Sequence, residues 1–262
     1  KGVGTFTTYN HSIAEFLFSA DWAPSDSAEG GGSVGAAIFI FGSVITCALA
    51  LAIATPFSLA TAIFMTEISP ELGKRFVQPA VEIFVGIPSV VYGWIGLTIL
   101  VPLIKNIFNL RFGFSVLAAG IVLAVMIFPT ITSLAADALR SIPKSYRAAS
   151  YGLGATRWQT IAKVVVPAAV TGLMTAVILG LARAFGEALA VAMVIGKMRA
   201  FPTSLLSPTN NLTAAIAADM GGAMEGSEYN IALWTMALML FIISLACIFA
   251  IHFLTAKGGK QA

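Results

Sequence analysis

Long apolar runs with few charged residues constrain the fold of this chain more than any other feature of its sequence. An α-helix needs about 20 apolar residues to cross the hydrocarbon core of a bilayer. Only 10% of the residues are charged, whereas about a quarter are charged in an average soluble domain. The sequence therefore predicts an all-α, polytopic membrane bundle with five spans in this chain. These spans are predicted at about 34–65, 77–104, 112–136, 164–195 and 231–255.

The polar stretches around these runs predict the domain organisation. Residues 1–33 are polar and mixed in composition, and we expect them to lie along the outer membrane surface without a fold of their own. Residues 34–256 are expected to form the transmembrane domain. The basic loop 137–163 within it is expected on the cytoplasmic side, followed at the end of the chain by a short tail, 257–262.

Lysine and arginine are distributed unequally between the two sides that the spans define. Because five spans alternate sides, loops 66–76 and 137–163 share one side with the C-terminus. That side carries nine Lys and Arg residues, and the other side carries five. Cytoplasmic segments carry an excess of these residues, so the C-terminus is expected in the cytoplasm and Lys1 outside, which predicts a further span upstream. The nine are Lys74, Arg75, Arg140, Lys144, Arg147, Arg157, Lys163, Lys257 and Lys260.

One polar interruption, from Arg140 to Pro167, is basic throughout and has no acidic residue. Ser145–Leu153 is predicted to form a short helix, which Gly154 can end in a left-handed conformation without steric cost. A second helix is predicted over Ala155–Lys163. This helix–Gly–helix shape suits docking into a groove on a soluble partner, and the alternative is a generic basic loop. The first helix is expected to expose the small residues Ala148, Ala149 and Ser150.

The same loop contains the spacing Ala148-Ala149-Ser150-x3-Gly154, followed after nine residues by Val164-x-Val166-Pro167. This spacing resembles the EAA loop of ABC importer permeases, EAA-x3-G-x9-I-x-L-P. Two positions depart from that pattern, since Ala148 stands in place of its Glu and Ser150 in place of its second Ala. The resemblance implies that the loop couples the chain to a separate ATPase. The implicated residues are Tyr146, Arg147, Ala148, Ala149, Ser150, Gly154, Arg157 and Pro167.

Arg183 and Glu187 lie within the fourth apolar run, where charged residues are rare. An arginine at mid-span costs about 2.5–3.5 kcal/mol on insertion scales, so it should face protein or water. A spacing of four places both side chains on one helix face, where they can pair. The planar guanidinium can bind an oxyanion through two hydrogen bonds, which predicts an anion pathway. Glu187 would then hold Arg183 when no anion is present, or accept a hydrogen bond from a protonated oxyanion. The alternative is an ion pair that only fixes helix packing.

Four segments of the chain resemble the phosphate-specific importer permeases, and the ending Val191–Gly196 is similar to their PstC type. The match extends over nearly the whole chain. It implies a role for Arg183 and Glu187 in phosphate passage, and a multi-pass protein of a bacterial or archaeal cytoplasmic membrane whose own first span precedes Lys1. It also implies a PstA-type permease subunit, two ATPase subunits that bind ATP and Mg, and a periplasmic or lipid-anchored phosphate-binding protein as partners. The segments are Leu181–Ala188, Val191–Gly196, Gly86–Gly93 and Ala118–Ile121.

Other chemistries find little support in the sequence. The sequence has no Gly-x4-Gly-Lys-Ser/Thr phosphate loop, so ATP hydrolysis is assigned to a partner. This chain is expected not to be an enzyme and to bind no cofactor or metal. Cys47 and Cys247 lie inside apolar runs and are predicted to be core residues. His11 and His252 are isolated in the sequence and are not expected to be ligands. The net charge of +3 does not indicate nucleic acid.

Two further residues within the second apolar run have alternative interpretations. Glu82 is interpreted as an interfacial residue rather than a pathway residue. Pro88 interrupts helical hydrogen bonding and is a candidate gate or hinge, with a static packing kink as the alternative. For the whole chain the alternatives are a permease for sulfate, molybdate or phosphonate, a secondary transporter without ATPase, and a membrane sensor.

Overall fold

A computed structural model describes residues 1–258, with every side chain in that range except those of 252 and 254–258. The chain divides into two compact units, each built from separate stretches of sequence. Unit 1 comprises Lys1–Ala50, Pro88–Leu123 and Ala184–Leu245, and unit 2 comprises Leu51–Ile87, Ala124–Arg183 and residues 246–258. Of the predicted tail 257–262, the last four residues lie outside the described residues, and the first two continue a helix.

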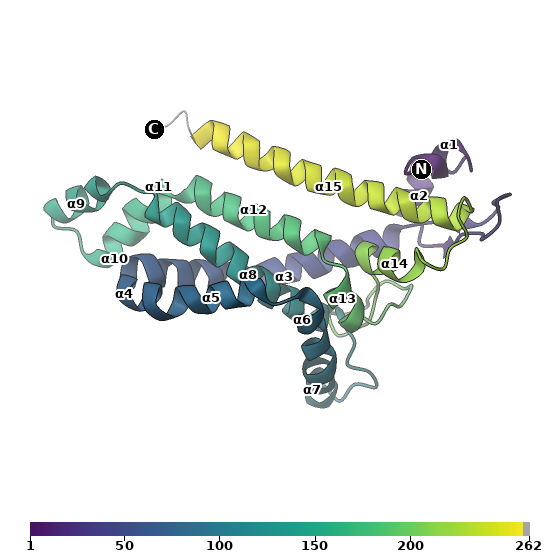
Figure 1. The fold of residues 1–262 in the computed structure, drawn as a ribbon, viewed down its shortest axis with the longest axis horizontal. Helices are drawn as coiled ribbons and strands as arrows, with labels where there is room; N and C mark the ends of the chain where they lie inside the picture. The colour runs from purple at the N-terminus through teal and green to yellow at the C-terminus, as the bar shows by residue number, and fades with distance from the viewer. Residues whose placement is uncertain (259–262) are drawn as a thin grey trace. The chain divides into compact units, whose positions relative to one another are not determined.

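Among residues 1–258, four helical segments are long and apolar enough to cross a membrane, and a bent pair makes a fifth if the pair forms one span (Figure 1). All five predicted spans therefore have a helical counterpart, although the bounds of some differ. The four segments are Ala37–Ile68, Ser89–Ile107, Val116–Arg140 and Glu228–Ile251. The bent pair joins Arg157–Ala168 to Val170–Gly186 at an angle of 68°.

Four long helices run through both units, and shorter elements belong to one unit each. The long helices are α3 (Ala37–Ile63), α8 (Val116–Arg140), α12 (Val170–Gly186) and α15 (Glu228–Gly258). Unit 1 also contains α1 (Gly4–Thr7), α2 (Ile13–Phe18), β1 (Trp22–Ala23), β2 (Ser33–Val34), α6 (Ser89–Ile95), η3 (Gly96–Leu100), α7 (Val101–Ile107), α13 (Leu189–Val194) and α14 (Leu212–Asp219). Unit 2 also contains η1 (Phe64–Ile68), α4 (Pro70–Leu72), η2 (Gly73–Val77), α5 (Gln78–Gly86), α9 (Lys144–Gly152), α10 (Arg157–Thr160), η4 (Ile161–Val165) and α11 (Val166–Ala168). The η segments are π-helical.

The N-terminal segment packs into unit 1 through two short helices and a pair of strands, and its position along the membrane surface stays a prediction. Its antiparallel strands β1 and β2 pair Trp22 with Val34. Trp22 meets the ring of Phe39 edge-on, with centroids 5.1 Å apart. Burial of large aromatic side chains stabilises the packing of this segment, although its overall composition is polar. The core here consists of Phe16, Trp22, Val34, Ala36, Phe39, Leu212, Ala215, Ala232, Leu233 and Met236.

In unit 2, glycines bring α8 and α12 close together. A Cβ atom added at Gly180 would lie 2.5 Å from Ile131 Cγ1, and one added at Gly172 would lie 2.6 Å from Ala138 Cβ. Small residues at such contacts let helix backbones approach closely within a membrane. This close packing holds α12, the helix that carries Arg183, against α8.

Two predicted spans are not single helices. The second is interrupted at Ile87–Pro88, which separates α5 from α6, because proline lacks an N–H and disfavours helical geometry in the preceding residue. The fourth is interrupted between Gly186 and Leu189. The counterpart of predicted span 77–104 is consequently Ser89–Ile107, which begins directly after Pro88.

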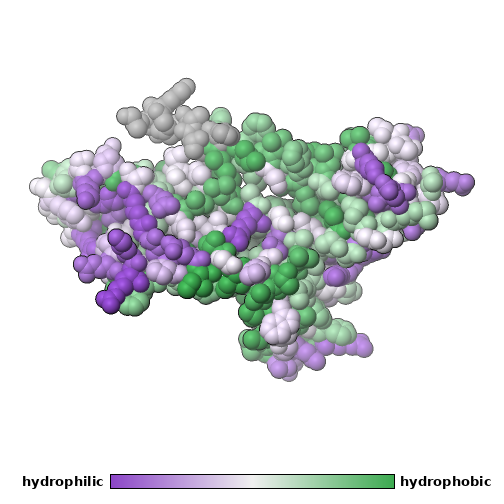
Figure 2. All heavy atoms as spheres, in the orientation of Figure 1, coloured by the Kyte–Doolittle hydropathy of each residue, from purple (hydrophilic) through white to green (hydrophobic). Residues whose placement is uncertain are grey.

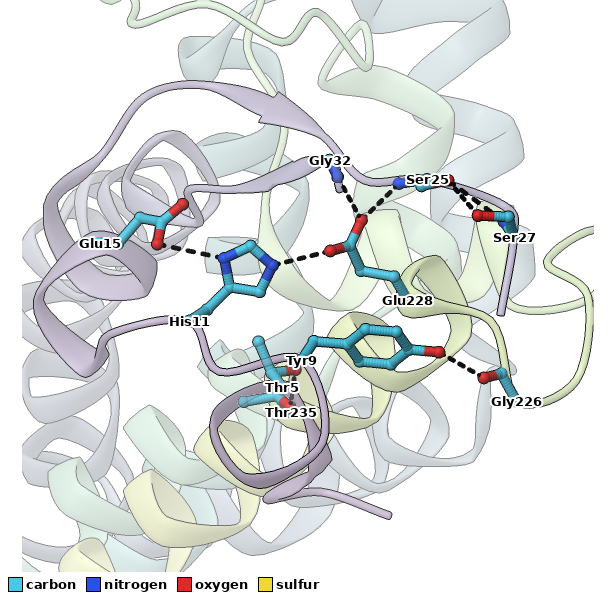
Figure 3. A network of polar contacts seen from close by, with 10 residues as sticks. All are labelled: Thr5, Tyr9, His11, Glu15, Ser25, Ser27, Gly32, Gly226, Glu228 and Thr235. Carbon is cyan, nitrogen blue, oxygen red and sulfur yellow. Dashed lines mark hydrogen bonds and ion pairs between the residues drawn. The ribbon is translucent and has the colours of Figure 1, made fainter. Parts of the chain in front are cut away.

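A cluster of polar contacts ties the N-terminal segment to the start of α15 (Figure 3). The carboxylate of Glu228, which is 1% exposed, accepts hydrogen bonds from Ser25 N at 2.7 Å and Gly32 N at 2.9 Å. His11 Nε2 lies 2.7 Å from Glu228 Oε1, and His11 Nδ1 lies 3.1 Å from Glu15 Oε2. His11 is therefore not isolated, and both of its ring nitrogens face carboxylates, which favours the imidazolium form.

This cluster predicts a pH-dependent stability. Burial alone would lower the pKa of His11, but the hydrogen bonds to Glu228 and Glu15 outweigh it and raise the pKa above 6.5. The stabilisation is therefore complete below pH 6.5 and is lost as the pH rises through the raised pKa. We expect the melting temperature of the purified chain in detergent to fall as the pH rises from below 6.5 through the raised pKa of His11.

His11→Gln should flatten this pH dependence, because it removes the group that titrates between Glu15 and Glu228. An equal pH dependence in the wild-type chain and the His11→Gln variant would show that another group is responsible.

Candidate functional site

The basic loop forms the predicted helix–Gly–helix. Helix α9 is followed by Gly154 with φ of +80°, a left-handed conformation that non-glycine residues rarely adopt. Helix α10 then begins with a capping box, in which Thr156 Oγ1 accepts from Gln159 N at 3.3 Å and Gln159 Oε1 accepts from Thr156 N at 2.9 Å. The chain continues through η4 and α11, which contains Pro167, into the 68° bend before α12.

The two helices of the loop form an apolar hollow of about 540 Å³. Leu153 at its rim is 89% exposed and Tyr146 is 50% exposed. Its lining residues are Ser145, Tyr146, Ala149, Ser150, Leu153, Ala155 and Val164. Figure 2 shows hydrophilic residues around this region, over α4, α9 and α10. An apolar hollow with a polar rim is typical of a surface that binds another protein.

Of the three small residues expected on the surface of α9, Ala148 and Ala149 are exposed, but Ser150 is only 8% exposed. Its hydroxyl lies 2.9 Å from Thr160 Oγ1, so Ser150 joins α9 to α10. The prediction of an exposed Ser150 is wrong because its position on the helix faces the second helix of the loop. Ser150 lines the hollow, but its side chain is largely buried.

The loop arginines point toward the end of the first span. Arg147 donates from Nε to Glu67 Oε2 at 3.1 Å and from Nη2 to Glu67 Oε1 at 2.5 Å. Arg157 Nη2 donates to the backbone carbonyls of Glu67 and Ile68. Sequence reasoning missed Glu67. The available signal was charge balance, since a loop with five basic residues and no acidic residue needs a carboxylate from elsewhere.

Arg183 lies three residues before the end of α12 and is partly buried. Its Nη1 donates a hydrogen bond of 2.6 Å to Thr130 Oγ1 on α8. Thr130 was also missed, because nothing near it in the sequence points to Arg183. The contact leaves most of the guanidinium donors available, since arginine has five N–H groups.

Glu187 lies beyond the end of α12 and has partners of its own. Its Oε1 accepts from Ala190 N at 3.2 Å, at the start of α13, and its backbone oxygen accepts from Thr213 Oγ1 at 2.8 Å. The predicted pairing of Arg183 with Glu187 assumed a continuous helix, but α12 ends at Gly186. Within the part of the chain that the structure describes, neither side chain belongs to an ion pair.

The remaining candidate residues have simpler surroundings. Glu82 is exposed and accepts from Gln78 Nε2 at 3.0 Å, and Gln78 Oε1 in turn accepts from Arg140 Nη2 at 3.1 Å. Cys47 is buried, as predicted for a core residue, and Cys247 is partly buried. Among residues 1–258, no group of three or more potential ligands could hold a metal ion.

Comparisons with known proteins agree with this architecture. The family described as "Binding-protein-dependent transport system inner membrane component" matches residues 54–257. The chain is 52% identical to the probable ABC transporter permease protein YqgH of Bacillus subtilis, over 98% of this chain and 82% of that protein. It is 36% identical to the phosphate transport system permease protein PstC of Haemophilus influenzae, over 92% of this chain and 81% of that protein.

A solved structure of the methionine ABC transporter MetNI, in an inward-facing conformation, shares the fold. The TM-score is 0.63 over 84% of this chain and 96% of that chain, with 22% sequence identity. The expected all-α membrane bundle of the ABC importer permease type is thereby confirmed.

The contact between Arg183 and Thr130 predicts a measurable contribution to stability. Hydrogen bonds to charged groups contribute about 1.5–3 kcal/mol, so Thr130→Val should lower the free energy of unfolding in detergent by about that amount. Thr130→Ser should retain most of the stability because it keeps the hydroxyl.

Thr132→Val is the matched control, since that hydroxyl donates only to Phe128 O within α8. Equal effects of Thr130→Val in the wild-type and Arg183→Gln backgrounds would contradict the interaction.

Proposed function

We propose that this chain, which belongs to the family of binding-protein-dependent transport system inner membrane components, is the PstC-type permease subunit of an ATP-driven importer of inorganic phosphate. It would form half of the translocation pathway. The permeases named PstC from several organisms support the substrate assignment, since they are 33–38% identical to this chain over most of its length. The observation that carries the proposal is Arg183, a cation within a transmembrane helix that is bound to a neutral hydroxyl.

Arg183 is suited to be the stepping point of a multiply charged oxyanion. A cation in a membrane span is costly unless a counter-charge reduces its energy. Thr130 occupies Nη1 and orients the planar group, and the remaining N–H groups form the fork that binds two oxygens of a phosphate. The transported anion would thus supply the counter-charge that the described residues do not provide through an ion pair.

Glu187 would contribute to the choice between phosphate and sulfate. At neutral pH phosphate carries at least one proton and can donate a hydrogen bond to a carboxylate, whereas sulfate cannot. Ala190 N already orients Oε1 of Glu187, so the second carboxylate oxygen is available as an acceptor. A carboxylate would also repel an anion that has no proton to share.

The apolar hollow at α9 and α10 would receive a separate ATPase subunit, which would bind ATP and Mg. Leu153 and Tyr146 present exposed apolar surface there, and Ala149 leaves room for a partner side chain. From this loop the chain passes through Pro167 and the 68° bend directly into the helix that carries Arg183. Coupling requires that the loop bind the ATPase differently in its two states.

The remaining partners follow from the family. A PstA-type permease subunit would complete the pathway, two ATPase subunits would bind on the cytoplasmic side, and a periplasmic or lipid-anchored phosphate-binding protein would deliver the anion. The excess of Lys and Arg supports a cytoplasmic position for the loop 137–163 and the C-terminus, in a bacterial or archaeal cell. Pro88, at the break between α5 and α6, is the proposed hinge.

Uptake of labelled phosphate by the reconstituted complex tests the function. We expect uptake that requires ATP and is inhibited by arsenate but not by sulfate. Arg183→Gln should abolish it while the complex still assembles, because the cation that binds the anion is lost. Arg183→Lys should restore only part of it, since lysine lacks the planar fork.

Other outcomes would redirect the assignment. Competition by sulfate, molybdate or phosphonate would identify another oxyanion as substrate. Uptake without ATP would indicate a secondary transporter, and normal uptake by Arg183→Gln would refute the pathway role.

Gly154→Val should weaken association with the ATPase, because a β-branched residue cannot adopt φ of +80° without strain. Gly152→Val is the matched control, since Gly152 is exposed, has no positive φ and has no atom within 4 Å of its added Cβ. Copurification of the ATPase with each variant provides the measurement. Full recovery of ATPase with Gly154→Val would contradict the role of the turn.

A further inference from the structure

The first span ends in unusual backbone geometry next to the loop. After α3 the chain continues as the π-helical segment η1, and Ser69 leaves the helical region with φ −140° and ψ 78°. The last carbonyls of a helix have no partner within the helix. Arg157 Nη2 donates to the carbonyls of Glu67 and Ile68, so it caps this end from the second helix of the loop.

Arg147 approaches the same end from the first helix of the loop. Besides its two hydrogen bonds to the Glu67 carboxylate, it donates to Ile142 O at 2.8 Å and Leu139 O at 3.0 Å. The side chains of Arg147 and Glu67 are only 20% and 9% exposed. Such a two-point, largely buried pair is held more rigidly than an exposed salt bridge.

These contacts link the loop to the first span within unit 2. Glu67, Arg147 and Arg157 are here called the Glu67 clamp. The hydrogen bond between Ser150 and Thr160 joins α9 to α10, so a force on either helix reaches the clamp. The segment held by the clamp is π-helical, and π-helical turns are frequent at functional sites because they depart from regular helical hydrogen bonding. The largely buried pair of Arg147 and Glu67 thus connects the loop that carries the apolar hollow to the π-helical end of the first span.

We propose that Glu67 is a positioning residue through which movement of the docking loop is transmitted to the first span. The inference rests on the proposed function, because it assumes that an ATPase binds the loop. Neither arginine needs to contact the ATPase in this scheme, although both lie in the EAA-like loop. Without the clamp, the ATPase would still dock on the exposed hollow and hydrolyse ATP, but the motion of the loop would not reach the span.

The test uses the complete complex and compares phosphate uptake with ATP hydrolysis. Glu67→Gln should lower the ratio of uptake to hydrolysis by about tenfold, a typical size for the coupling between two sites, while the ATPase subunits still copurify. Glu71→Gln is the matched control, because Glu71 lies four residues away, is exposed and belongs to no ion pair within residues 1–258. Glu67→Asp, which keeps the charge on a shorter side chain, should give an intermediate ratio.

A charge exchange makes the test more specific. Glu67→Arg and Arg147→Glu should each uncouple the complex, and the double variant should recover part of the ratio. An unchanged ratio in Glu67→Gln would overturn the proposal. Loss of the ATPase subunits from that variant would overturn it as well, since the clamp would then serve assembly.

A measurement without substrate separates this proposal from the assignment of phosphate. Spin labels at Leu72 and Gly152, both exposed, report the separation of the helix end from α9. In the wild-type complex this distance should stay constant when ATP is added, whereas in Glu67→Gln it should change or broaden. A constant distance in both the wild-type and the Glu67→Gln complexes would refute the role of the clamp, even if phosphate uptake is normal. If the distances behave as expected but phosphate is not taken up, only the assignment of phosphate as the substrate would be refuted.

Discussion

The hydrocarbon core of a membrane contains no water, so every polar group inside it must find a partner within the protein. Arg183, near the end of α12, and Glu187, just beyond it, meet this constraint in different ways. One carboxylate oxygen of Glu187 accepts a hydrogen bond from the backbone N–H of Ala190 in α13. Arg183 donates to the hydroxyl of Thr130 and forms no ion pair among the described residues. The difference assigns separate roles to two residues that the spacing alone treated as one pair.

The loop that we propose to dock the ATPase and the helix that carries Arg183 lie on one continuous stretch of the chain. The docking loop, the bend after Pro167 and the helix that carries Arg183 follow one another without a long flexible connection. Glycines hold α12 against α8, which supplies Thr130. The Glu67 clamp adds a second connection, from the loop to the first span. In the proposed mechanism, a movement of α9 would reach the helices of unit 2 by two routes, one through the backbone and one through the largely buried pair of Arg147 and Glu67.

Local features were predictable from the sequence. Apolar length located the helices, the conformational freedom of glycine identified the turn at Gly154, and the EAA-like spacing located the loop. Contacts between distant segments were not predictable, because no local pattern encodes them. His11 and Glu228 are 217 residues apart, Arg147 and Glu67 are 80 apart, and Arg183 and Thr130 are 53 apart. The inward-facing Ser150 and the break after Gly186 were missed for the same reason, since tertiary packing decides both.

In the proposed function, Arg183 directly contacts the transported phosphate. A ³¹P–¹⁵N dipolar coupling, measured by solid-state NMR on the complex with ¹⁵N-labelled arginine and bound phosphate, tests it most directly. The account predicts a coupling to a guanidinium nitrogen in the wild-type complex that disappears in Arg183→Gln. A coupling that persists in the variant, or no coupling in a wild-type complex that transports phosphate, would contradict it.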